Sequence, residues 1–576
     1  MNGRNASSHH MPVGRIHFLL ILFGILVLLI IGQVIRFQIV SSEELADRAT
    51  AGRFAIDEVP ARRGEIFDSN GARLATNEPS ARVWAILSDL EEDPESVART
   101  LAPHLERSAD EVLERLQLPD AEWVLLGQQI DAEDVQAIEE LDIDGIFLEP
   151  QAGRVYPHGS FASHLLGFAN YDNEGSYGIE GAYDGVIGGD PGQLVGERDG
   201  AGNLIALSPS TWDPPQDGSD VTLTIDSGVQ RIIEDVLQDA IKDQNASGGT
   251  IIVQDPKTGA ILGMASSPTY DPNHFDDVDD ISVFSNPSIS QVYEPGSTFK
   301  SIVMAIALNE GAVTPETTFD DAPGYVEVPD HPPITNNNGN VYGVQTMTEV
   351  LVRSSNLGAI FAAEQVGSDR LYKGFNQFGF GKRSGIDLEG EERGILTLPW
   401  ETGWNQTLFY TNAFGQGIAT TPLQVVNAYS ALANGGQLME PYLVSETHHR
   451  DGMVERREPE VTRQAISSET SAEMREMLHQ VVERRYGDWV QVPGYNIGAK
   501  TGTAQVPDEE GGYRDDDTIA SIVGFGPVED PQFTVLVKID QPRESPWGET
   551  VAGPAMAEVF SELFLLYGIP PTESIE

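Results

Sequence analysis

One serine–lysine pair has the spacing of a nucleophile and its base. The only Ser-x-x-Lys in the chain is Ser297-Thr298-Phe299-Lys300, inside YEPGSTFKSIVMAIALNEG. Pro295-Gly296 predicts a turn, and the apolar run after it predicts a helix ending near Gly311. Ser297 would then begin a helix, where developing negative charge is favoured, and Lys300 would lie one turn along the same face. Burial among apolar neighbours would make Lys300 a base for the serine hydroxyl, although an N-cap serine and a surface lysine fit the same residues.

A second pattern pairs a hydroxyl with a carboxamide. Ser354-Ser355-Asn356 is the only Ser-x-Asn in the chain, and it falls where a helical run begins or is interrupted. A serine hydroxyl can relay a proton, and an asparagine amide can orient a peptide backbone. An N-cap for a helix starting at Leu357 is the alternative interpretation.

Lys-Thr-Gly occurs twice, in different surroundings. Lys257-Thr258-Gly259 lies in a predicted hairpin turn, where such residues are ordinary turn formers. Lys500-Thr501-Gly502-Thr503 opens a predicted strand near the C-terminus. A lysine and hydroxyls on a strand edge can bind a carboxylate, and a glycine lets a substrate backbone approach closely. We therefore take the second copy as the functional one.

The order of these motifs points to one family. Ser-x-x-Lys, Ser-x-Asn and Lys-Thr-Gly, in this order, are typical of penicillin-recognising serine acyltransferases. Longer blocks such as ARRGEIFDSNGARLA, RVYPHGSFASHLLGF and GQGIATTPLQVVNAYSALANGG extend the similarity over nearly everything after residue 16. The chain resembles the class B penicillin-binding proteins, the monofunctional D,D-transpeptidases of peptidoglycan synthesis. It is more similar to their cell-division branch than to their elongation branch.

The resemblance implies a role for each motif residue. Ser297 would attack the D-Ala-D-Ala carbonyl and form an acyl-enzyme, with Lys300 as its general base. Ser354 would relay a proton to the leaving D-alanine, and Asn356 would position the peptide. Lys500 would support the relay electrostatically.

The Lys-Thr-Gly segment would also bind substrate. Thr501 and Thr503 would hold the terminal carboxylate, and Gly502 would admit the substrate backbone. Backbone N–H groups of Ser297 and Thr503 would form the oxyanion hole. No cofactor and no metal ion is expected.

Paired extended segments predict the scaffold around these residues. Residues 249–255 and 260–266 read as strands around a turn, and so do 518–526 and 532–540. Residues 221–241 start as a strand and continue as a helix with Asp226 or Ser227 as its N-cap. Hairpins at both ends with helices between them predict an α+β fold with an antiparallel sheet and a helical subdomain.

The preceding region is expected to be a separate, non-catalytic pedestal of mixed structure. Residues 61–77 predict a hairpin around Asp68-Ser69-Asn70-Gly71, and residues 86–145 predict small amphipathic helices. A stretch rich in Pro and Asp, 208–220, predicts a linker. The resulting boundaries are residues 41–212 for the pedestal, or dimerisation domain, and 220–570 for the transpeptidase domain.

The N-terminal segment is expected to be a membrane anchor. Residues 16–35 carry no formal charge and are long enough to cross a bilayer as one helix. A cleaved signal peptide would be shorter and followed by small residues. Arg4 and Arg15 precede the span, so residues 1–15 are expected in the cytoplasm. This predicts a single-pass inner (plasma) membrane protein with its catalytic part outside.

Composition excludes some other classes. The chain has 576 residues, a formal net charge of −54 and no cysteine. A nucleic-acid binder would need a basic surface, and no thiolate chemistry is available.

The resemblance also implies binding partners. They are peptidoglycan stem peptides, β-lactams as covalent inhibitors, a polytopic membrane glycosyltransferase and other division proteins.

Other functions fit the same sequence. They are an elongation-branch transpeptidase, a β-lactam sensor or non-catalytic scaffold on the same fold, and a β-lactamase.

Overall fold

The computed structural model describes residues 13–41, 54–119, 121–197, 211–328, 331–507 and 512–572. By packing, the chain forms two compact units: residues 1–61 with 190–216, and residues 62–189 with 217–576.

The first unit contains the apolar helix α1 (Val13–Ile35), which continues as a π-helical turn, Arg36–Val40. The helical stretch from Gly14 to Ile39 is long and apolar enough to cross a membrane. The predicted span 16–35 lies within it. The unit also holds an antiparallel sheet of β1 (Phe54–Val59), β8 (Gly192–Glu197) and β9 (Thr211–Asp213).

The second unit is built around a five-stranded antiparallel sheet with the order β12-β11-β23-β22-β21. Its strands are β11 (Gly248–Gln254), β12 (Ile261–Ser267), β21 (Gly498–Pro507), β22 (Tyr513–Gly526) and β23 (Phe533–Asp540). All seven residues of β11 are buried, as expected for a strand covered on both faces. Both predicted hairpins are confirmed, and strands from opposite ends of the catalytic region pair directly.

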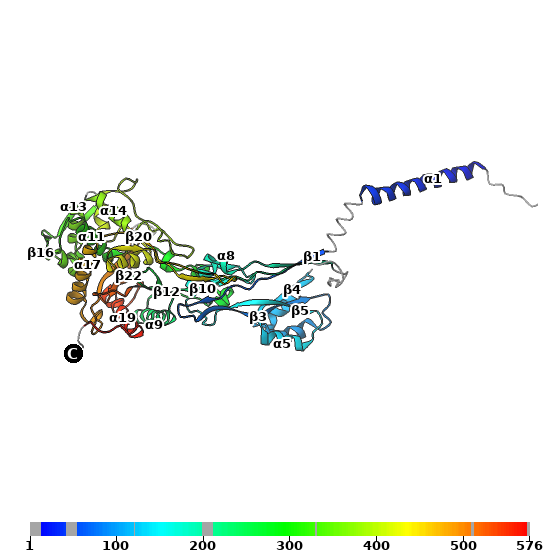
Figure 1. The fold of residues 1–576 in the computed structure, drawn as a ribbon, viewed down its shortest axis with the longest axis horizontal. Helices are drawn as coiled ribbons and strands as arrows, with labels where there is room; N and C mark the ends of the chain where they lie inside the picture. Colours follow the sequence, from blue (N-terminus) through cyan, green and yellow to red (C-terminus); the bar gives the residue numbers. More distant parts are fainter. Residues whose placement is uncertain are drawn as a thin grey trace, which may run out of the picture. The chain divides into compact units, whose positions relative to one another are not determined.

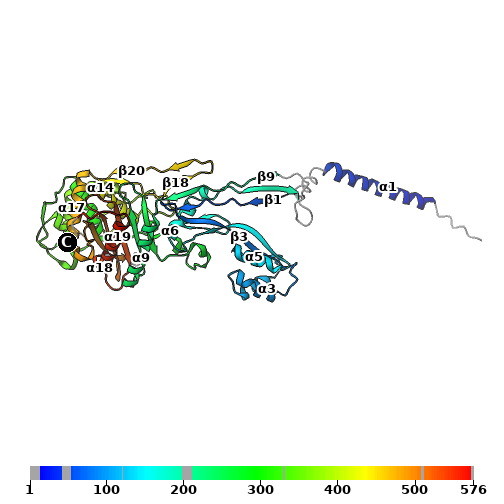
Figure 2. The same cartoon turned by 60° about the horizontal axis from the view of Figure 1, so that its bottom comes forward.

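Helices cover the two faces of this sheet. On one face α9 (Ser227–Gln244) packs against α19 (Gly553–Leu566), as Figure 2 shows. On the other face lie α16 (Pro422–Ala433) and α17 (Ser468–Val481). Asp226 is the N-cap of α9, and its Oδ1 accepts the N–H of Gly228 at 2.8 Å. Ser227, the other predicted cap, is the first residue of α9, and its hydroxyl donates to Asp68 Oδ2 at 2.6 Å.

A helical subdomain adjoins the sheet. Figure 1 shows α11, α13 and α14 gathered there. Its helices are α11 (Phe299–Asn309), α12 (Met347–Arg353), α13 (Asn356–Val366), α14 (Ser368–Gln377) and α15 (Gln406–Asn412). Two short hairpins accompany them: β13 (Thr318–Asp320) with β16 (Val344–Thr346), and β14 (Tyr325–Val328) with β15 (His331–Thr335). The α+β class with an antiparallel sheet and a helical subdomain is confirmed.

The pedestal shares a sheet with the catalytic region. The order is β19-β18-β10-β2-β3-β4, with β5 also pairing with β3. Its strands are β2 (Ile66–Phe67), β3 (Arg73–Ile86), β4 (Trp123–Asp131), β5 (Ile146–Val155), β10 (Asp220–Leu223), β18 (Val444–His448) and β19 (Val454–Arg456). The predicted hairpin at 61–77 is confirmed as β2 and β3.

The prediction of helices alone over residues 86–145 is wrong in one segment. α3 (Pro94–Leu101), α4 (Ala109–Leu116) and α5 (Ala132–Leu141) form as expected, but β4 lies between α4 and α5. The apolar run in β4 pairs with β3, and this tertiary pairing decides a segment whose local pattern is ambiguous.

Short elements complete the second unit. They are α6 (Ser163–Leu166), α7 (Gly178–Ala182), α8 (Asp184–Ile187), α10 (Pro287–Ser290), α18 (Gly548–Val551), β6 (Phe168–Ala169), β7 (Gly175–Ser176), β17 (Gln437–Met439) and β20 (Val461–Gln464).

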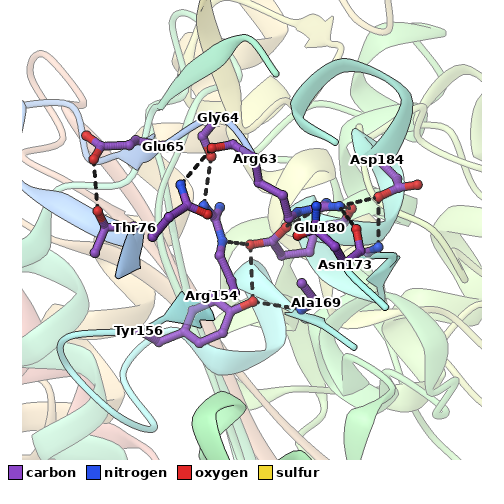
Figure 3. A network of polar contacts seen from close by, with 12 residues as sticks. Arg63, Gly64, Glu65, Thr76, Arg154, Tyr156, Ala169, Asn173, Glu180 and Asp184 are labelled. Carbon is purple, nitrogen blue, oxygen red and sulfur yellow. Dashed lines mark hydrogen bonds and ion pairs between the residues drawn. The ribbon is translucent and has the colours of Figure 1, made fainter. Parts of the chain in front are cut away.

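A buried charge network fastens the start of β2 to α7 and β5 (Figure 3). The carboxylate of Glu180, which is fully buried, accepts Arg63 Nε at 2.9 Å and Arg154 Nε at 2.6 Å. The Tyr156 hydroxyl donates to the same carboxylate at 3.1 Å, and Arg63 also reaches Asp184 at 2.7 Å. Buried charges need such partners, so this part of the pedestal depends on all of them being present.

Candidate active site

The nucleophile turn is held between a loop and the edge strand of the sheet. Gly296, at φ +55°, donates its N–H to Gly415 O at 3.0 Å. A Cβ on Gly296 would lie 3.0 Å from Thr503 O, so the turn passes directly against β21. Ser297 lies in the 3₁₀ turn Gly296–Thr298, and α11 follows at once. The predicted position at a helix start is confirmed.

Lys300 lies beneath the serine, inside the protein. Lys300 is 1 % exposed, and this burial is expected from its apolar neighbours on α11. Its Nζ donates to Ser354 O at 2.7 Å and to Ser354 Oγ at 3.2 Å. Among the residues that the structure describes, the Ser297 hydroxyl makes no hydrogen bond, which leaves it available at the cavity wall. Contacts of catalytic groups are often loose before a ligand is bound.

Ser354 occupies the junction of two helices. It is the C-cap of α12 in the left-handed conformation, at φ 55°, and Ser355 is the N-cap of α13. The break between helices turns the Ser354 hydroxyl toward both lysines. Asn356 opens α13, and its Nδ2 donates to Thr335 O at 3.0 Å. Ser355 is therefore the N-cap of α13, whereas the Ser354 side chain is not a helix cap and contacts the two lysines instead.

Lys500 reaches the same hydroxyl from the sheet. It is fully buried on β21, and its Nζ donates to Ser354 Oγ at 3.2 Å. Further contacts go to Tyr486 Oη at 3.4 Å and to Thr501 O at 3.3 Å. Two lysines from distant segments thus meet at one serine oxygen.

Burial lowers the pKa of both lysines. For Lys300 the pKa lies well below its usual value because of desolvation first, and then the charges of Lys500 and Arg485. For Lys500 burial and the charge of Arg485 lower the pKa to about 7, while Glu549 acts in the opposite direction. Low lysine pKa values are what general-base chemistry near neutral pH requires.

The edge of β21 presents donors to the site. Among the described strands, β21 pairs only with β22, so alternate N–H groups point away from the sheet. Thr501 N–H is one of these, because it donates to Tyr486 Oη at 2.9 Å. Thr503 lies two residues on, so its N–H faces the same edge. A Cβ on Gly502 would lie 2.7 Å from Pro295 O, so this glycine lets the strand and the nucleophile turn approach each other.

A cavity of about 460 Å³ joins these groups. Six of the predicted residues line it: Ser297, Lys300, Ser354, Asn356, Thr501 and Thr503. Lys500 contacts it through Ser354, and Gly502 supports its wall. By contrast, Lys257 of the other Lys-Thr-Gly copy pairs with Asp530 at 2.7 Å, half-exposed in a turn.

Comparison with known proteins now fixes the family. The transpeptidase domain of penicillin-binding proteins matches residues 249–561, more than half of the chain. The chain belongs to the penicillin-binding proteins. The dimerisation domain of that family matches residues 58–223. The expected class B family and the serine transpeptidase class of enzyme are thereby confirmed, while the boundaries 41–212 and 220–570 stay predictions.

Individual relatives span almost the whole chain. Stage V sporulation protein D of Bacillus subtilis is 35% identical over 566 residues, covering 97% of this chain and 87% of that protein. The peptidoglycan D,D-transpeptidase FtsI of Escherichia coli is 28% identical, covering 95% of this chain and 90% of that protein. Penicillin binding protein 3 from Mycobacterium tuberculosis, solved in complex with aztreonam, is 25% identical with a TM-score of 0.70, covering 90% and 99% of the two chains.

Some residues that line or lie behind this penicillin-binding protein's cavity could not be identified from motifs. Arg485 and Tyr486 come from a π-helical turn, Val482–Tyr486, at the end of α17. Arg485 Nε donates to Glu549 Oε2 at 3.1 Å, and Trp547 lines the opening at 42% exposure. These residues carry no local signature. Only the Arg-Arg-Tyr-Gly interruption of an otherwise helical pattern hints at an irregular turn, and π-helical turns are common at functional sites.

Proposed function

We propose that this chain is a peptidoglycan D,D-transpeptidase in which Ser297 is the acylated nucleophile, and that it serves septal wall synthesis. The D,D-transpeptidase class follows from the family. The observation that carries the residue assignment is the convergence of Lys300 and Lys500 on Ser354 Oγ, beside Ser297 in one cavity.

Acylation proceeds in one coupled sequence. Neutral Lys300 takes the hydroxyl proton as Ser297 Oγ attacks the carbonyl carbon of the penultimate D-alanine. The C–N bond to the terminal D-alanine then breaks as Ser354 passes its hydroxyl proton to the leaving amine. Ser354 regains a proton from Lys300, whose Nζ lies 3.2 Å from Ser354 Oγ. Lys500, as a cation, stabilises the charge that develops around Ser354. Loss of free D-alanine leaves an ester on Ser297.

The peptide is held by the neighbouring donors. Thr501 and Thr503 bind the terminal carboxylate, and Asn356 binds the peptide backbone. The N–H groups of Ser297 and Thr503 stabilise the oxyanion, a contribution that can exceed a hundredfold in rate. The outward edge of β21 supports this role for Thr503.

Transfer completes the reaction. An amine of a neighbouring stem peptide attacks the ester carbon and loses a proton to neutral Lys300. The C–O bond to Ser297 breaks, and Ser297 takes that proton back from Lys300. The new amide is the cross-link. A β-lactam acylates the same serine and leaves it blocked.

Incubation of the full-length protein in detergent with a donor peptide ending in D-Ala-D-Ala and an acceptor amine tests this. We expect free D-alanine and a donor–acceptor product, both lost in Ser297→Ala. Lys300→Arg keeps the charge but cannot accept a proton, so it should lose at least about a hundredfold in rate. Undiminished product from Ser297→Ala would contradict the assignment.

The cellular role rests on similarity. The match to FtsI of Escherichia coli over almost the full length supports a division role. The anchor supports a single-pass protein with a cytoplasmic N-terminus and an exterior catalytic region. Nothing in the chain resembles a glycosyltransferase, so we propose a polytopic membrane glycosyltransferase and other division proteins as partners.

Depletion in the host separates the branches. A septal enzyme predicts blocked septation, and filaments in a rod-shaped host, whereas swollen round cells would indicate the elongation branch. The 35% identity to a protein named for sporulation favours a spore-wall role as the second candidate. Normal vegetative division with defective spores would support that role instead.

A further inference from the structure

Tyr486 stands directly behind the Lys-Thr-Gly segment. It is 1% exposed at the end of the π-helical turn that follows α17. Its Oη lies 2.9 Å from both Thr501 N and Thr501 Oγ1, and 3.4 Å from Lys500 Nζ. One buried phenol therefore contacts both the backbone and the side chain of a proposed carboxylate-binding residue.

The protons of this cluster can be assigned by counting donors. A backbone N–H and an ammonium can only donate. The Tyr486 oxygen therefore accepts from Thr501 N–H, and from Lys500 while that lysine is protonated. The single Tyr486 proton is left for Thr501 Oγ1. Burial raises the pKa of Tyr486, so the phenol keeps this proton at neutral pH.

The Thr501 hydroxyl then has one direction left for its own proton. Its oxygen accepts from Tyr486, and the residue lines the cavity. Thr503 is arranged in the same way, because its Oγ1 accepts Gly548 N–H at 3.2 Å. Both threonine hydroxyls can therefore donate their protons into the cavity. A hydroxyl that accepts one hydrogen bond becomes a stronger donor in the next.

We propose that Tyr486 is a positioning residue that fixes the Thr501 hydroxyl as a donor to a ligand carboxylate, and so makes the site selective for acylating ligands with a free carboxylate. The proposal rests on the proposed function, since it concerns ligands that acylate Ser297. It adds a determinant of ligand choice outside the three motifs.

The test compares two acylating ligands that differ only in whether the carboxylate is free or esterified. Second-order rates of acylation of the full-length protein in detergent are measured at pH 6 with benzylpenicillin and with its methyl ester. Wild type should prefer the free acid. In Tyr486→Phe the rate with the acid should fall about tenfold further than the rate with the ester, because a hydrogen bond to a charged group is weakened.

Tyr270→Phe is the matched control. Tyr270 is also buried, at 5% exposure, and its hydroxyl donates to Ser163 O at 3.0 Å, away from the cavity. Its acid-to-ester ratio should equal that of wild type. An unchanged acid-to-ester ratio of acylation rates in Tyr486→Phe, with or without an equal loss for both ligands, would overturn the proposal.

A second variant covers the case in which Tyr486→Phe does not fold. Thr501→Val removes the donor itself and should collapse the acid-to-ester ratio, whereas Thr501→Ser should keep it. A wild-type ratio in Thr501→Val would overturn the proposal without reference to Tyr486. Absence of acylation of wild type by either ligand would instead refute the proposed function, and the inference with it.

Discussion

At the scale of single residues, two buried lysines share one hydroxyl. Lys300 and Lys500 both donate to Ser354 Oγ at 3.2 Å. Like charges so close disfavour double protonation, and burial disfavours each charge separately. The pKa of Lys300 lies well below its usual value, and the pKa of Lys500 is lowered to about 7. The arrangement thus favours a neutral Lys300, which suits a base, and a Lys500 that is protonated below a pH of about 7, which suits an electrostatic partner.

The first prediction is a bell-shaped pH dependence of acylation. Proton removal from Ser297 needs neutral Lys300, so the rate should fall as pH drops through the lowered pKa of that lysine. Stabilisation by Lys500 needs its charge, so the rate should also fall as pH rises through about 7. Second-order rates with a fluorescent penicillin from pH 5 to 9 measure both limbs. A rate that keeps rising up to pH 9 would contradict the assigned charges.

The motif residues could be predicted because their spacing is local. Ser297 and Lys300 are one helical turn apart, and Thr501 and Thr503 are two residues apart on the same face of one strand. The role of Tyr486 could not be predicted, because it depends on a π-helical turn packing against β21 from outside the strand. No residue pattern near Tyr486 encodes that contact.

At the scale of elements, the nucleophile turn is set by close backbone approaches. Gly415, at φ +83°, faces Gly296, and a Cβ on Gly415 would lie 2.1 Å from Gly296 O. On the other side, β21 lies against the turn at Gly502. Neither neighbour is a side chain that could rotate away, so the position of Ser297 depends on backbone geometry.

Gly415→Ala should displace this turn. We expect a clear loss of acylation rate together with a lower melting temperature, because the added Cβ meets backbone atoms and the positive φ disfavours alanine. Gly403→Ala is the control, since Gly403 also has a positive φ, +99°, but no atom lies within 4 Å of its Cβ position. The control should cost about 1 kcal/mol of stability and leave acylation rates near wild type. Equal acylation by the two variants would count against the packing argument.

Element prediction succeeded where a segment's own pattern is decisive. The strands around residues 249–266 and 518–540 are buried, β-branched and separated by turns, and they appear as predicted. The strand β4 could not be predicted, because its apolar run suits a helix equally well until β3 pairs with it. Distant pairing is the information that a local pattern lacks.

At the scale of the whole molecule, pedestal and catalytic region are joined by shared structure. Strand β10 pairs with β2 of the pedestal on one side and with β18 of the catalytic region on the other. The Glu180 network fixes the start of β2 against α7 and β5. Coupled stability of the two regions follows from this continuity.

Glu180→Gln should therefore destabilise more than one region. Removing the carboxylate leaves Arg154 buried without its charge partner and leaves Arg63 with Asp184 alone, which costs about 3–5 kcal/mol. Arg73→Ala is the control, because the Arg73 side chain is largely exposed and its pair with Glu65 is worth no more than about 1 kcal/mol. Denaturant unfolding followed by fluorescence measures both variants. Equal shifts in the two midpoints would contradict a structural role for the network.

Whether Ser297 carries the acyl group can be determined by peptide mapping. The full-length protein is reacted with benzylpenicillin, digested and analysed by mass spectrometry. We predict a single penicilloyl adduct on the peptide containing Ser297, absent from Ser297→Ala. An adduct on another residue, or one that persists in Ser297→Ala, would show that Ser297 is not the nucleophile.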